Sequence, residues 1–189
     1  MRAPALALVL LVSLLMAAPL AARPANVTDP DVPRSLPVDG PVNVSWGDPS
    51  GFTELRYSGN RWEAERGNWV LQLADYLRVR AGKALPAGQR IEFNITDIKR
   101  AGDYEPWHDS SAQDVRIVRD LYPPSMRFSF VRYGAHGQVM DQGERKLVDV
   151  SFLSRGSTAR QSDPLRYEKR MLDDWIRREL KSDLSMPAD

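Results

Sequence analysis

The first 22 residues of this chain are mostly apolar, and we do not expect them to be part of the folded domain. Arg2 is followed by uncharged, mostly apolar residues as far as Ala22, and the run ends in small side chains. A positive start, an apolar centre and a small-residue end are the parts of a secretory signal peptide. We therefore expect residues 1–22 to be cleaved and the mature protein to lie in the periplasm, or to be secreted.

An uncleaved membrane anchor is the alternative for this leader. Spanning a bilayer takes about 20 predominantly apolar residues. The run reaches that length only if Pro4, Ser13 and Pro19 are included. Pro19 also stands where a signal peptide commonly ends its helix before the cleavage site. We expect no stable membrane insertion after cleavage.

The chain contains no cysteine, which excludes disulfides, thiol catalysis and thiolate metal sites. Small exported domains that cannot build a sufficient core usually rely on disulfides. This protein must instead be stabilised by burial alone. Loss of the leader leaves 167 of the 189 residues, enough for one hydrophobic core.

The charges of the mature chain are balanced. The sequence has 26 basic and 25 acidic residues, and the only charge in the leader belongs to Arg2. The two signs alternate along the chain, whereas a nucleic-acid-binding protein carries a basic stripe. We therefore expect no nucleic-acid partner.

Prolines divide the mature chain into a lead-in and a folded unit. Residues 23–41 contain five prolines, which cannot continue a helix or lie inside a sheet. We expect a flexible lead-in there, a single globular domain over residues 42–181, and a carboxy-terminal tail over residues 182–189.

Alternating apolar and polar residues predict strands at 42–46, 91–96 and 126–130, and a return strand from Val139 towards Phe152. The glycines of residues 134–137 predict the turn of a β-hairpin between the last two. Because apolar Leu147 and Val148 are adjacent, we expect a β-bulge at that point.

Two helices are predicted from apolar residues at helical spacing. The first begins at Asn60, which forms a capping box with Glu63, and ends at Gly82. The second begins with Asp163 as its cap and Pro164 in its first turn. The tryptophans on the apolar faces of these two helices are expected to lie in the core, namely Trp62, Trp69 and Trp175.

These elements predict an α+β fold of two layers. Two amphipathic helices would pack on one face of a mostly antiparallel sheet of four to five strands.

The long connection from Lys99 to Tyr122 carries the candidate functional residues. Loops of this length without secondary structure are often functional. Carboxylates, an imidazole and two aromatic rings fall close together in it, and the rings suit stacking on a sugar or a peptide side chain. We predict a binding loop formed by Asp103, Tyr104, Glu105, Trp107, His108 and Asp109.

Two other interpretations of this loop remain open. Trp107 can pin the loop onto the core while Glu105 and Asp109 pair with Arg116 or Arg119. Alternatively, a carboxylate and the imidazole of His108 can perform acid–base catalysis if a pocket brings them together.

The common catalytic motifs are missing from the sequence. There is no G-x-S-x-G, S-x-x-K or H-E-x-x-H motif and no phosphate-binding glycine loop. The two histidines, His108 and His136, are too few for a histidine-based metal site. We therefore predict no catalytic residue, no metal and no cofactor.

Several ordered motifs between about Val42 and Leu180 are similar to those of a known family. They are ITDI at 95–98, EPW at 105–107, DVRIVRD at 114–120, YPP at 122–124, GER at 143–145 and DPLRYEK at 163–169. The chain resembles the bacterial family called domain of unknown function 3016, small exported proteins of proteobacteria. The resemblance implies an envelope location and one compact domain, and it implies no activity.

The shared motifs also predict a charged network that supports the long loop. Its members are Asp97, Arg116, Arg119, Asp120, Asp163 and Glu168.

Three functions are consistent with these observations. The first is a non-enzymatic module that binds an unknown protein or envelope component through the Lys99–Tyr122 loop. The second is an envelope hydrolase that uses Glu105, His108 or Asp109 as acid and base. The third is a structural role in the envelope without a small ligand.

Overall fold

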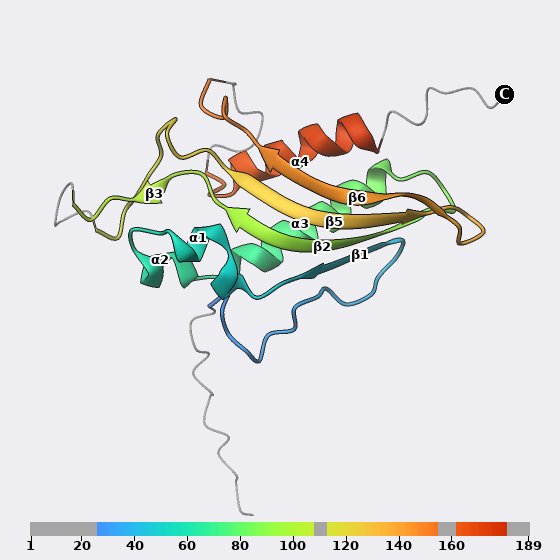
Figure 1. The fold of residues 1–189 in the computed structure, drawn as a ribbon, viewed down its shortest axis with the longest axis horizontal. Coiled ribbons are helices and arrows are strands. Elements are labelled where there is room, and N and C mark those ends of the chain that lie inside the picture. Colours follow the sequence, from blue (N-terminus) through green and yellow to red (C-terminus); the bar gives the residue numbers. More distant parts are fainter. Residues whose placement is uncertain (1–25, 108–112, 155–161, 181–189) are drawn as a thin grey trace, which may run out of the picture.

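The computed structural model describes residues 26–107, 113–154 and 162–180 of the chain. Within these ranges it forms an α+β domain (Figure 1). The strands are β1 (Val42–Trp46), β2 (Arg90–Lys99), β3 (Asp103–Tyr104), β4 (Arg116–Ile117), β5 (Ser125–Tyr133) and β6 (Val139–Val148). The helices are η1 (Pro49–Gly51), α1 (Thr53–Arg56), α2 (Arg61–Glu65), α3 (Trp69–Ala84) and α4 (Arg166–Glu179).

The main sheet is mixed and has four strands in the order β1-β2-β5-β6. β2, β5 and β6 are antiparallel neighbours, as expected, and the hairpin between β5 and β6 is confirmed. β1 is parallel to β2, with Val44 opposite Phe93. Parallel neighbours need a long crossover, which the segment containing α1, α2 and α3 provides. β3 and β4 form a separate two-stranded sheet.

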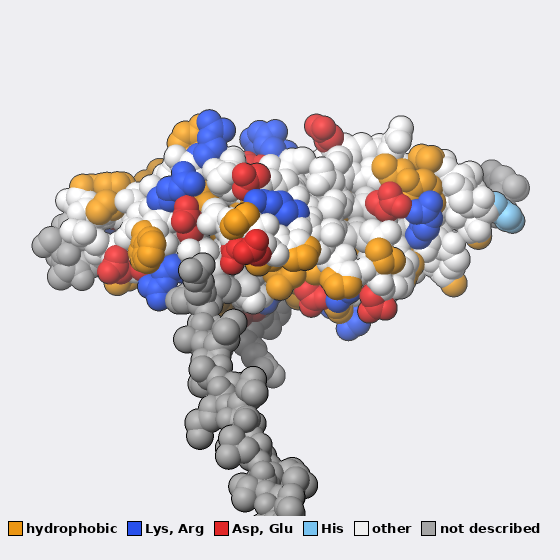
Figure 2. All heavy atoms as spheres, turned by 90° about the horizontal axis from the view of Figure 1, so that it is seen from below, with side chains coloured by type: hydrophobic (Ala, Val, Ile, Leu, Met, Phe, Trp, Pro, Cys, Tyr) orange, Lys and Arg blue, Asp and Glu red, His pale blue; other side chains and the backbone are white. Residues whose placement is uncertain are grey.

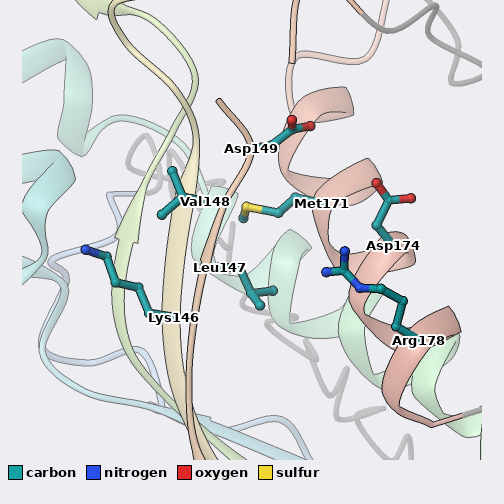
Figure 3. A pocket seen from close by; sticks show the side chains of 7 residues that line it. All are labelled: Lys146, Leu147, Val148, Asp149, Met171, Asp174 and Arg178. Carbon is teal, nitrogen blue, oxygen red and sulfur yellow. The ribbon is translucent and has the colours of Figure 1, made fainter. Parts of the chain in front are cut away.

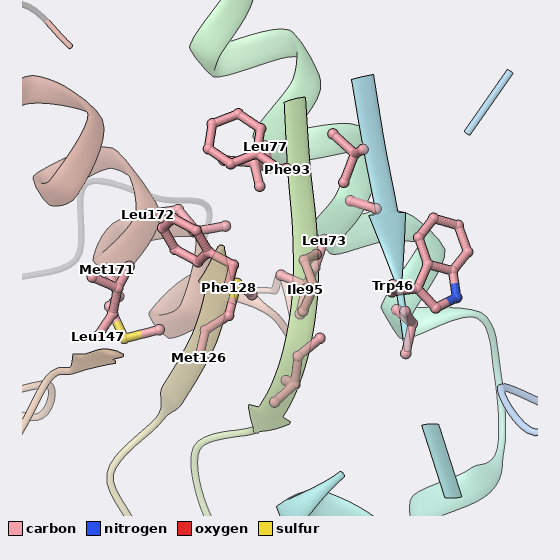
Figure 4. Packing of buried hydrophobic residues seen from close by; sticks show 14 of the residues in the cluster. Trp46, Leu73, Leu77, Phe93, Ile95, Met126, Phe128, Leu147, Met171 and Leu172 are labelled. Carbon is pink, nitrogen blue, oxygen red and sulfur yellow. The ribbon is translucent and has the colours of Figure 1, made fainter. Parts of the chain in front are cut away.

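The hydrophobic core lies between the main sheet and the two long helices, α3 and α4, which also pack on each other. Alternate residues of each inner strand face this core, as in a sheet with one covered face (Figure 4). The Trp175 ring of α4 packs edge-on against Phe93 and Phe128, with ring centroids 5.8 and 4.9 Å away. This aromatic contact anchors α4 to the middle of the sheet.

The proline-rich segment is attached to the domain along part of its length. The Leu36 amide donates to the Val44 carbonyl at 2.9 Å, and the Trp46 amide donates to the Arg34 carbonyl at 2.9 Å. Leu36 is also part of the buried core. The prolines thus shape a segment that lies along the outer edge of β1.

The first predicted helix is two helices in the structure. α2 begins after Asn60, whose side chain accepts from the Glu63 amide at 3.2 Å, so the predicted cap is confirmed. The helix breaks at Gly67, which has a φ of +89° that a side chain would strain. The chain then restarts as α3 and continues through Gly82 to Ala84. The expected end at Gly82 was therefore wrong.

The break changes the position of Trp62. A continuous helix would place Trp62 on the same face as Trp69, but the two belong to separate helices. Trp69 is 3% exposed, and its ring nitrogen donates to the Ala64 carbonyl at 3.0 Å. Trp62 is 70% exposed, so its predicted place in the core was wrong.

Two predicted boundaries also differ from the structure. β6 ends at Val148 with regular pairing of Leu147 and Val148, and the register shift lies at the other end of the hairpin, near Tyr133. The second long helix begins at Arg166 rather than directly after Asp163. The Asp163 side chain accepts from the Leu165 amide at 2.9 Å, so it closes the turn that precedes the helix.

Within the described ranges, no helix has the length and apolar character needed to cross a bilayer.

The two tryptophans give a direct test of the helix break. Trp69→Ala should lower the free energy of unfolding by about 3–5 kcal/mol, because it removes a buried ring from the core. Trp62→Ala should change it by less than about 0.5 kcal/mol, because that ring is exposed. Denaturant titration followed by circular dichroism measures both, and equal losses would contradict the structure.

Candidate functional site

The predicted loop forms an arm that extends beyond one end of the main sheet (Figure 1). We use this name for the described residues 100–107 and 113–124. The arm contains the small sheet of β3 and β4, in which Asp103 pairs with Ile117. At its base the Gly102 amide donates to the Tyr122 carbonyl at 3.0 Å. The arm is therefore closed by backbone hydrogen bonds.

A buried carboxylate fixes the base of the arm. Glu54 of α1 has no exposed surface. Its Oε2 accepts the Arg100 amide at 2.8 Å, and its Oε1 accepts Arg100 Nη2 at 2.9 Å. Oε1 also accepts a hydrogen bond from Arg116, and Lys99 Nζ lies 3.6 Å from Oε2. We call these four residues the Glu54 cluster.

The charges of the Glu54 cluster stabilise one another. Burial tends to raise the pKa of Glu54, but Arg100, Arg116 and Lys99 outweigh this effect and hold the pKa below its ordinary value of 4.5. Glu54 is therefore a carboxylate at neutral pH. It joins α1 to the end of β2 and to the arm.

Aromatic rings and a glycine complete this base. The Arg100 guanidinium lies 4.6 Å from the centroid of the Trp69 ring, and that of Arg116 lies 4.7 Å from the centroid of the Tyr104 ring. Gly102 has a φ of +79°, and a Cβ at this position would lie 2.6 Å from the Ile117 carbonyl oxygen. Only glycine lets the two sides of the arm approach so closely.

Three of the predicted loop residues are buried at the base of the arm: Asp103, Tyr104 and Glu105. Asp103 lies 3.1 Å from Lys99 Nζ. Glu105 accepts the Tyr122 hydroxyl at 2.9 Å and lies 3.0 Å from Arg119 Nη2. These carboxylates therefore hold the arm together.

Trp107 of the predicted loop lies outside this buried base. Trp107 is 71% exposed, although it follows Glu105 by only two residues. His108 and Asp109 lie outside the described residues. The structure thus separates Trp107 from the acidic residues with which it was grouped.

Two predicted network residues connect other elements to this base. Asp97 of β2 accepts the Thr53 amide at 2.6 Å and its hydroxyl at 2.7 Å, which fixes the first residue of α1. Glu168 of α4 accepts the Ala101 amide at 2.6 Å. Its other oxygen is buried without a hydrogen-bond partner in the described part of the chain.

The remaining network residues are not part of the same contact. Asp120 is exposed, and its side chain accepts the Leu121 amide at 2.9 Å. Asp163 pairs with Lys169 Nζ at 2.7 Å in the first turns of α4. The residues predicted as one network therefore form separate local contacts.

Sequence reasoning missed Glu54, which has more cationic partners than any predicted network residue discussed above. It stands in a short TELR segment that resembles an exposed helix turn. The flanking apolar residues Phe52 and Leu55, both buried, were a usable signal that this turn lies against the core.

The surface has two hollows of note. One of about 160 Å³ lies between the end of β6 and α4, where Leu147 and Met171 approach each other (Figure 3). Asp149 at its rim is paired with Arg170 at 3.0 Å. The other hollow, of about 660 Å³, lies beside the arm and is lined by Arg119, Asp120, Val150, Ser151, Leu153 and Ser154. Both are shallow surface features rather than enclosed pockets.

Among the residues that the structure describes, no group of three or more histidine, aspartate or glutamate side chains is arranged to hold a metal ion.

Comparison with known proteins identifies the family. Residues 40–178 match the family model described as a protein of unknown function, domain of unknown function 3016. The chain belongs to this family. No curated protein and no solved structure matches the chain. The matched region includes α1 with Glu54, the whole arm and nearly all of α4.

Glu54→Gln should destabilise the protein by about 3–5 kcal/mol, because it removes a fully buried carboxylate and leaves the partly buried Arg100 and Arg116 without their counter-charge. The contribution of Glu54 should be present above pH 4.5 and be lost as the pH falls through its lowered pKa. Urea unfolding between pH 3 and pH 7 measures both effects. Glu63→Gln removes an exposed pair with Arg66 and should cost less than about 1 kcal/mol.

Glu168 should show the opposite pH dependence. Burial raises its pKa above the ordinary value of 4.5, so its favourable contribution is complete below pH 4.5 and is lost as the pH rises through the raised pKa. Glu168→Gln keeps an oxygen for the Ala101 amide and cannot ionise. The variant should therefore gain stability relative to the wild type between pH 5 and pH 8. Melting temperatures of both proteins over this pH range test the prediction. A difference in melting temperature between Glu168→Gln and the wild type that does not change with pH would contradict it.

Proposed function

We propose that this protein is a non-enzymatic binding module of the cell envelope that captures its partner through the outer part of the arm. The partner is a protein or an envelope polymer, and Trp107 makes the central contact. The leader, which has the composition of a signal peptide, supports the periplasmic location that we propose.

One contrast within the arm supports this proposal. Asp103, Tyr104 and Glu105 are fixed by buried contacts, whereas Trp107, two residues after Glu105, is 71% exposed. A large ring at the surface of a well-anchored segment loses little conformational freedom when it binds. Tryptophan is also the residue type that most often dominates binding energy at interfaces.

The chemistry of the exposed ring fits the two partner classes. An indole ring stacks on apolar side chains and on the apolar face of a sugar, and its N–H donates a hydrogen bond. Pro106 precedes Trp107 and restricts the backbone at this point. The backbone that leads to the ring therefore has fewer conformations.

The hydrolase alternative has less support from the geometry. Oε1 of the Glu105 carboxylate accepts the Tyr122 hydroxyl, and its Oε2 forms an ion pair with Arg119. An acid–base role would require this carboxylate to face a substrate in a concave site.

Trp107→Ala should abolish capture of the partner while leaving the melting temperature within a few degrees of the wild type. The physical reason is that the exposed ring contributes to the contact and not to the core. In-cell crosslinking of the exported protein, followed by mass spectrometry of the crosslinked material, provides the measurement.

Two further variants make this test specific. Trp107→Phe retains a stacking ring and should retain part of the capture. Met140→Ala removes a 48% exposed apolar side chain from the hairpin at the opposite end of the molecule and should retain all of it. Unchanged capture by Trp107→Ala would show that the arm is not the binding surface.

A further inference from the structure

The point at which the chain enters the described domain is fixed by two contacts with α2. Asn26, the first described residue, forms a β-bridge with Arg66, and the Val27 amide donates to the Glu65 carbonyl at 3.0 Å. The leader therefore connects to the domain at the end of α2.

The sequence leaves little chain between this point and the apolar leader. The apolar run ends at Ala22, four residues before Asn26. Four residues span at most about 14 Å when fully extended. Whenever the leader occupies a bilayer, the end of α2 must lie close to the surface of that bilayer.

The side chains around this point have the character of a membrane interface. Trp62 of α2 is 70% exposed and stands four residues before Arg66, the residue that caps the end of this helix. Tyr57, at the end of α1, is 66% exposed. Tryptophan and tyrosine are enriched where proteins meet lipid headgroups, because their rings are apolar and their N–H and O–H groups remain in contact with water.

The charged residues of this region are largely paired with one another. Arg61 lies 2.7 Å from Glu65, and Arg66 lies 2.7 Å from Glu63. Viewed from the side of α1 and α2, hydrophobic side chains stand among charges of both signs (Figure 2). Attraction to a bilayer would therefore come mainly from the aromatic rings and would depend only weakly on anionic lipids.

We propose that, while the leader is still attached, the surface formed by Tyr57, Arg61, Trp62 and Arg66 rests on the lipid bilayer into which the leader inserts. We call it the lipid-facing surface. Its aromatic rings enter the headgroup region, and the arm remains available to a partner. This inference does not depend on the binding role of the arm.

The absence of cysteine allows a direct test on the full chain. Arg61→Cys places a single nitroxide label on the lipid-facing surface, and Met140→Cys places one at the hairpin at the opposite end of the molecule (Figure 1). Each labelled chain is reconstituted in phosphatidylcholine vesicles. Electron paramagnetic resonance then measures collisions of each label with oxygen, which concentrates in lipid, and with a water-soluble nickel complex.

The label at position 61 should collide several-fold more with oxygen, relative to nickel, than the label at position 140. Adding Trp62→Ala to Arg61→Cys should move its ratio towards that of position 140, whereas Trp62→Phe should preserve it. Equal ratios at the two positions would overturn the proposal. A high ratio that Trp62→Ala leaves unchanged would also overturn it, because the leader alone would then hold the domain near the bilayer. Melting temperatures of all variants verify that the domain is folded.

Discussion

The buried carboxylate of Glu54 is the interaction on which the arrangement of this domain depends. It balances Lys99, Arg100 and Arg116, which come from the end of β2 and from the arm. Without it, the partly buried guanidinium groups of Arg100 and Arg116 would lose their counter-charge, which is strongly unfavourable. Asp97, which holds the start of α1, fixes the position from which Glu54 reaches them.

This arrangement places buried, paired residues and an exposed aromatic ring within a short stretch of chain. Asp103 and Glu105 hold the arm together, and the exposed ring of Trp107 lies two residues beyond Glu105. A second exposed ring, Trp62, lies on α2 beside the entry point of the chain. The domain thus presents aromatic rings from two structural elements while its long helices and sheet provide a rigid core.

Repeating patterns were predictable from the sequence, and single irregular residues were not. The alternation in β2 and β5 and the helical spacing in α4 each involve several side chains, so they identified these elements correctly. The break at Gly67 depends on one positive φ, which the helical spacing of the apolar residues does not reveal. Glu54 was missed because long-range ion pairs between α1, β2 and the arm leave no local pattern.

The segment that lies along β1 has a consequence for the solubility of the protein. An outer strand with unpaired backbone groups invites other chains to pair with it. The backbone of Arg34 and Leu36 occupies that position on β1, and at the opposite side of the sheet β6 carries the charges of Glu144, Arg145 and Lys146. The proline-containing segment thus protects the domain from edge-to-edge aggregation. A chain that began at residue 42 would expose the unpaired backbone groups of β1.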